Sequence, residues 1–122
     1  MSPERFEQLV GQVLAGLPPR IAGYLDNVTV QVAEEPSEAD RRRMRLRGGQ
    51  TLFGLYVGVP LTERDTRYTN VAPDRIMIYR GPILRTFAAD AAVREQIRKT
   101  VLHEIGHHFG LDETDLEYAG YG

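Results

Sequence analysis

The sequence predicts an α+β fold, because segments with helical periodicity flank three short segments with strand-like composition. Apolar residues recur at helical spacing at residues 3–17 and again at 90–109. Between them, residues 28–32, 51–59 and 75–79 are rich in β-branched and aromatic side chains. The expected order is therefore α-β-β-β-α, with a last short helix after the second periodic segment.

The N-terminal helix is predicted from its first residues and from its apolar stripe. Ser2 is suited to be the N-cap, Pro3 to be the first helical residue, and Glu4 places an acid in the first turn. The stripe that follows comprises Phe6, Leu9, Val10, Val13, Leu14 and Leu17. Pro18-Pro19 ends this helix, and residues 20–25 are expected to form a further short helical turn.

The central part is predicted to hold three strands joined by loops. Residues 28–32 alternate valine with threonine and glutamine, which is typical of a half-buried strand. The second strand is expected to end at Pro60 and the third at Gly81-Pro82. We interpret residues 34–50 as a long loop, because they are charged and end in two glycines; residues 61–74 are polar and are also interpreted as a loop.

Composition bounds the classes of function. With 122 residues, the chain is expected to form one domain over residues 1–122. The absence of cysteine excludes disulfides, zinc–thiolate sites and a cysteine nucleophile, and it favours a cytoplasmic location.

The charge and the hydropathy of the sequence limit the classes of partner that we expect. The first ten residues lack the apolar core of a signal peptide, and no segment is apolar enough to span a membrane. The net charge of −2 gives no general attraction to nucleic acid, and the five arginines between 41 and 47 are interpreted as a solvated surface. We therefore expect a monomer without a nucleic-acid or membrane partner.

The histidines indicate a metal site. All three lie in one stretch, and His103 and His107 are four residues apart. On a helix this spacing places two imidazoles on one face, one turn apart, where they can share one metal ion. Glu104 lies about 100° around the helix from His103, so its carboxylate is expected to reach a metal-activated water without ligating the metal.

The rest of this helix divides into a polar stripe and an apolar arc. Gln96 and Thr100 fall on the same side as His103 and His107, which predicts a polar stripe that leads to the metal. His108 falls within the apolar arc, so we expect a packed, hydrogen-bonded histidine instead of a ligand. The arc expected to face the core comprises Val93, Ile97, Val101, Leu102, Ile105 and Phe109.

A third metal ligand is expected after the helix. Gly110 is placed to end the helix in a left-handed conformation and to turn the chain back toward the histidines. A catalytic zinc site has three protein ligands and one open position. Because the chain has no fourth histidine, the third ligand is expected to be an oxygen donor, and Asp112, Glu113 and Glu117 are the candidates.

The segment HEIGHHFGLDE, after LFGLYVGVPL and PDRIMIYRGPIL, resembles a family of short bacterial proteins with a minimal zincin-like fold, described as possible zinc metallopeptidases. The resemblance implies a small mixed sheet of three or four strands beside the histidine helix and the N-terminal helix. It also implies that His103, His107 and Glu113 bind Zn²⁺ and that Glu104 is the general base. The longer zinc motif of metzincins is similar, but they have histidine where this chain has Glu113, and no methionine follows the motif here.

These observations predict a zinc-dependent peptidase that hydrolyses peptide bonds through a metal-activated water with Glu104 as general base. The substrate is expected to be an extended peptide or protein segment that adds a strand to the sheet, with residues 51–56 as the edge strand. The alternative is a metal-binding or interaction module on the same scaffold with weak or no hydrolytic activity. The small size and the missing methionine favour that alternative.

Overall fold

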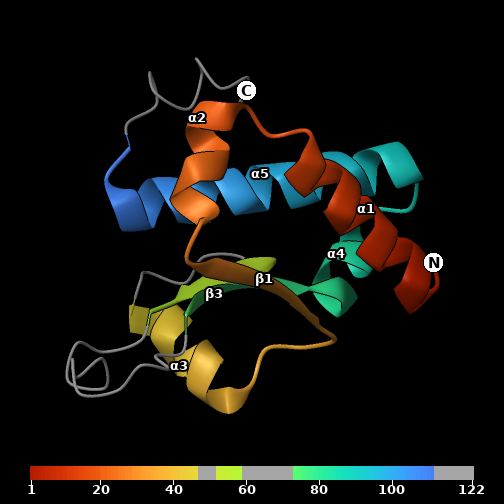
Figure 1. The fold of residues 1–122 in the computed structure, drawn as a ribbon. Coiled ribbons are helices and arrows are strands. Elements are labelled where there is room, and N and C mark those ends of the chain that lie inside the picture. Colours follow the sequence, from red (N-terminus) through yellow and green to blue (C-terminus); the bar gives the residue numbers. More distant parts are fainter. Residues whose placement is uncertain (47–51, 59–72, 112–122) are drawn as a thin grey trace.

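The computed structural model describes residues 1–46, 52–58 and 73–111, and it shows the α+β fold expected from the sequence (Figure 1). None of the helices in these ranges is long and apolar enough to cross a membrane. The elements, in chain order, are α1 (Pro3–Ala15), α2 (Pro19–Ala22), the 3₁₀ turn η1 (Gly23–Leu25), β1 (Val28–Ala33), α3 (Glu38–Leu46), β2 (Gly54–Val57), β3 (Asp74–Tyr79), α4 (Arg80–Thr86) and α5 (Asp90–Phe109).

The three described strands form a mixed sheet in the order β1-β3-β2. The central strand β3 runs parallel to β1, with Val28 opposite Asp74 at one end and Ala33 opposite Tyr79 at the other. It runs antiparallel to β2, with Gly54 opposite Ile78. The mixed sheet is thus confirmed, and β2 lies at one edge of the described strands.

The N-terminal part follows the sequence prediction closely. The Ser2 hydroxyl accepts a hydrogen bond from the Arg5 backbone N–H at 3.1 Å, which caps α1 as expected. The helix ends at Ala15, and Gly16 is its C-cap, two residues before the proline pair. The short helical turn predicted at residues 20–25 is present as α2 and η1.

The two faces of the sheet carry different cores, because successive residues of a strand point to opposite sides. One face packs against α1 and α5, and its strand residues are Val28, Val30, Val32, Tyr56, Ile76 and Ile78. The opposite face, on the side of α3 in Figure 1, carries Ala33, Leu55, Val57, Met77 and Tyr79. The larger core thus lies between the sheet and the helix that bears the histidines.

The prediction of a loop across residues 34–50 is wrong over Glu38–Leu46, which form α3. Ser37 caps this helix by accepting a hydrogen bond from the Asp40 backbone N–H at 3.1 Å. The Asp40 carboxylate is buried and accepts a 2.8 Å hydrogen bond from the Tyr79 hydroxyl, which anchors α3 to the end of β3. Arginine and glutamate are good helix formers, so a charged segment with a serine cap and one buried anchor folds as a helix.

The chain after β3 also differs from the prediction. The strand ends at Tyr79, but Gly81 and Pro82 lie within the first turn of α4, where proline is tolerated. The Gly81 backbone N–H donates to the Glu34 carbonyl oxygen at 2.8 Å. A Cβ atom at residue 81 would lie 2.6 Å from that same oxygen, so the close approach requires glycine.

Helix α5 begins and ends where the sequence predicts. Gly110 follows it in the left-handed region with φ of +69°, and the Leu111 backbone N–H donates to the Gly106 carbonyl at 3.0 Å. Five residues of the predicted apolar arc are fully buried: Val93, Ile97, Val101, Leu102 and Ile105. The sixth is a correction, since Phe109 is 37% exposed and its ring lies against that of Tyr24, with the centroids 4.8 Å apart.

Helix α5 and β2 approach closely at Gly54, which gives a test of this packing. A Cβ atom at residue 54 would overlap the Thr100 side chain and would lie 2.7 Å from the Met77 carbonyl oxygen. Gly54→Ala is therefore expected to lower the free energy of unfolding by about 1–3 kcal/mol in urea denaturation, as overpacking does.

The matched control for this substitution is Gly11→Ala. Gly11 lies in the middle of α1, and a Cβ atom there would meet nothing within 4 Å. This control is expected to raise the free energy of unfolding by roughly 0.5–1 kcal/mol, the usual gain from replacing a mid-helix glycine. Equal stability of Gly54→Ala and wild type would contradict the close packing of α5 on β2.

Candidate metal centre

His103 and His107 lie side by side on the last two turns of α5. Their ring centroids are 4.4 Å apart and their planes are inclined by 38°. The His103 side chain is partly buried and that of His107 is exposed. Two neighbouring imidazoles at a solvent-accessible helix face match the nitrogen donors that zinc prefers, so these residues fit a shared metal ion.

Glu104 points in a different direction from the histidine pair, toward β2. The residue is only 4% exposed, and its Oε1 atom accepts a hydrogen bond from the Tyr56 backbone N–H at 2.7 Å. This direction follows from the helix, because one residue turns the side chain by about 100°. The carboxylate is thus held against β2, about 100° around α5 from His103.

The N–H group that Glu104 binds lies on the side of β2 that faces away from β3, the outer edge of the described strands. The Tyr79 backbone N–H donates to the Phe53 carbonyl at 2.9 Å, so Phe53 and Tyr79 are a hydrogen-bonded pair of the antiparallel ladder. Residues on one strand of such a ladder alternate in direction. The backbone groups of Gly54 and Tyr56 therefore point away from β3, and Glu104 binds one of them.

The Tyr56 side chain joins the same cluster to the start of β3. Its ring stacks on that of His108, with the centroids 3.8 Å apart and the planes at 10°. Its hydroxyl donates to Asp74 Oδ2 at 2.7 Å, and His108 Nε2 lies 3.9 Å from the same oxygen. The His108 ring therefore packs against the Tyr56 ring, while 38% of the His108 side chain is exposed to solvent. The sequence gives no signal for the roles of Tyr56 and Asp74.

The two ends of the predicted polar stripe on α5 have different surroundings. Thr100 is buried against β2, and its hydroxyl donates to the Gln96 carbonyl oxygen at 2.8 Å. The Gln96 side-chain amide donates to the same hydroxyl at 3.0 Å. Gln96 and Thr100 are thus hydrogen-bonded to each other within the helix. The side chains of the stripe that are suited to bind a metal are those of His103 and His107.

The candidates for the third ligand, Asp112, Glu113 and Glu117, lie outside the described residues, as does the short helix expected there. Within residues 1–46, 52–58 and 73–111, no three His, Cys, Asp or Glu residues gather closely enough to hold a metal ion. The described part of the site therefore consists of two imidazoles and the adjacent carboxylate of Glu104.

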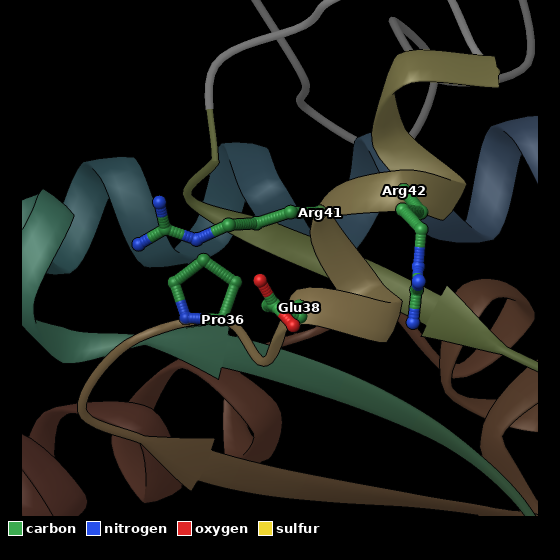
Figure 2. Close-up of a pocket in the computed structure, with 4 residues that line it drawn as sticks. All are labelled: Pro36, Glu38, Arg41 and Arg42. Atoms are coloured by element: carbon green, nitrogen blue, oxygen red, sulfur yellow. The ribbon is translucent and has the colours of Figure 1, made fainter.

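A polar pocket of about 440 Å³ lies apart from the histidines, at α3 and the segment before it. Figure 2 shows its lining residues, Pro36, Glu38, Arg41 and Arg42. The two guanidinium groups point in different directions, and the Glu38 carboxylate lies between the two side chains. Their positive charges do not converge, so this pocket provides no focused site for an anion.

Comparison with known families agrees with the geometry of the histidine helix. The model of the zincin-like metallopeptidase family matches residues 25–121. The match begins at the end of η1 and includes the sheet, all of α5 and the acidic residues beyond it. No curated protein matches the chain. Because the family match spans most of the sequence, the chain belongs to the zincin-like metallopeptidase family.

Proposed function

We propose that the protein is a zinc-dependent metallopeptidase that hydrolyses peptide bonds in peptide or protein substrates. The observation that carries this proposal is that Glu104 follows His103 in α5 and that its carboxylate, which points toward β2, is held in place by the Tyr56 backbone N–H. General-base catalysis requires a carboxylate fixed within reach of the attacking water. Membership in the zincin-like metallopeptidase family supports the same reaction class.

In this proposal His103 and His107 bind the metal through their imidazole nitrogens, and Glu113 supplies a carboxylate oxygen as third ligand. Glu113 stands six residues after His107, beyond the left-handed Gly110 that turns the chain at the end of α5. When bound, zinc supplies Lewis acidity, which polarises a peptide carbonyl and lowers the pKa of water.

The chain's own part in the reaction is proton transfer by Glu104. Its carboxylate takes a proton from the attacking water as the new C–O bond forms. It then delivers that proton to the leaving amine as the peptide C–N bond breaks. The hydrogen bond from Tyr56 limits the rotamers of Glu104, so part of the entropic cost of positioning the base is met during folding.

An extended substrate is proposed to dock at the outer edge of β2. Peptide segments commonly bind by adding a strand to a sheet edge, where backbone hydrogen bonds provide the affinity. The backbone groups of Gly54 face this edge, whereas the Tyr56 N–H is already bound to Glu104. In this proposal the substrate backbone lies beside the general base.

The test is chelator-sensitive hydrolysis of an unfolded substrate such as casein. The zinc-loaded protein is expected to cleave casein, the chelated protein to lose this activity, and one equivalent of zinc to restore it. Metal analysis of the same samples ties activity to zinc content. Binding of one equivalent of zinc without any cleavage would contradict the proposal and would favour a metal-binding module.

A further inference from the structure

We propose that Tyr56 is the positioning residue for Glu104, so that β2 sets the orientation of the general base. This inference rests on the proposed role of Glu104 in proton transfer. Tyr56 lies 48 residues before Glu104 in the chain, yet its backbone N–H holds Glu104 Oε1 at 2.7 Å. The contact is therefore a product of tertiary packing between α5 and the sheet.

The burial of both partners makes this hydrogen bond effective. Tyr56 is 3% exposed and Glu104 is 4% exposed, so little water competes for either group. A hydrogen bond to a carboxylate is stronger than one between neutral groups, and it strengthens further in a low local dielectric. Because the bond holds Oε1, it restricts the rotation of the carboxylate and the positions open to its second oxygen.

Tyr56 is itself held from two sides, which makes it a firm support. Glu104 and His108 are four residues apart, so they lie on one face of α5, and both contact Tyr56. On the other side, the Tyr56 hydroxyl donates to Asp74 at the first position of β3. Two turns of α5 and the start of the central strand thus determine where the Tyr56 N–H points.

The direct test replaces the Leu55–Tyr56 amide by an ester, through incorporation of the α-hydroxy analogue of tyrosine at residue 56. The ester removes the Tyr56 N–H and keeps the side chain, and the lost donor faces away from β3. It also weakens the Leu55 carbonyl as an acceptor in the ladder with β3, an effect that the ester at residue 54 reproduces at the Phe53 carbonyl. We expect kcat for casein-derived peptides to fall by about 10-fold or more, because misplacing a catalytic group is costly. Zinc affinity should stay within about two-fold of wild type, because neither histidine is touched.

The matched comparison is an ester at residue 54, whose N–H faces the same edge in the same strand. Because Glu104 does not bind it, its loss is expected to change KM through substrate docking while kcat stays within about two-fold. A double-mutant cycle adds a second arm. In the Glu104→Gln background, where the base is absent, the ester at 56 should have little further effect on kcat.

A readout without activity comes from hydrogen exchange of the Tyr56 amide in the zinc-free protein. Glu104→Ala removes the acceptor and is expected to speed exchange of this amide about 10-fold or more relative to neighbouring β2 amides. An unchanged exchange rate, or an equal fall of kcat with the two esters, would overturn the positioning role. Wild-type protein that binds zinc without cleaving peptides would instead count against the proposed function, whatever the exchange rate shows.

Discussion

Glu104→Gln is expected to lower peptidase activity by about 10²-fold or more while zinc content stays near that of wild type. Glutamine cannot accept the proton of the attacking water, so the general base is lost. Its side-chain oxygen can still accept the hydrogen bond from the Tyr56 N–H, so the packing of α5 on β2 is expected to persist. The measurement is kcat/KM on a casein-derived peptide, with zinc content determined on the same preparation.

Two comparisons make this result specific. The free energy of unfolding of Glu104→Gln should lie within about 1 kcal/mol of wild type, since a neutral hydrogen bond replaces a charged one at the same place. Addition of excess zinc should not restore activity, because the metal ligands are intact. Equal activity of the variant and wild type would show that another group accepts the proton.

His103→Ala is expected to abolish stoichiometric zinc binding. The variant leaves His107 as the single imidazole on that face of α5, and one imidazole with one carboxylate is a poor zinc site. Titration with zinc against a competing chelator should show no site at one equivalent, while circular dichroism shows the helices retained. Full retention of zinc by this variant would refute the assignment of the histidine pair.

His108→Ala provides the matched control in the same helix. The His108 ring stacks on Tyr56, so its removal is expected to leave one equivalent of zinc bound.

The same zinc titration distinguishes the candidates for the third ligand. Glu113→Ala should weaken zinc binding by roughly 10-fold or more. Losing a residue that only hydrogen-bonds a metal ligand already weakens binding by about 10-fold, and losing a ligand itself should cost at least as much. Asp112 is expected to be the N-cap of the short helix predicted after Gly110, so Asp112→Ala should mainly reduce stability, by about 1 kcal/mol. The reverse pattern would identify Asp112 as the ligand.

The parts of the fold that were predicted from sequence are those with local causes. The bounds of α5 follow from its apolar period and from Gly110, whose left-handed conformation ends the helix. The Ser2 cap of α1 and the alternating valines of β1 are equally local signals. Four-residue spacing on a helix was enough to bring His103 and His107 together, because that geometry depends on the helix alone.

The parts that were not predicted depend on contacts between distant residues. Helix α3 is anchored by the hydrogen bond between Asp40 and Tyr79, which are 39 residues apart, so its charged sequence alone gave the wrong interpretation. The Tyr56–Glu104 bond depends on the register of β2 and on its place beside β3 at one edge of the described strands, which follow from strand pairing. Phe109 lies one turn past Ile105 at the end of the helix, where its ring contacts Tyr24 and the edge of Tyr56 and stays partly exposed.

The binding of the Tyr56 N–H by Glu104 also bears on self-association. A strand at the edge of a sheet offers unpaired backbone groups to other chains and is a common starting point for aggregation. Here β2 has four residues, and a carboxylate from α5 takes one of its outward donors. A second copy that paired with this edge at Tyr56 would have to break a buried bond to a charged group. The carboxylate proposed for proton transfer thereby disfavours pairing of another chain at Tyr56, while the Gly54 backbone groups proposed for substrate docking are not bound by it.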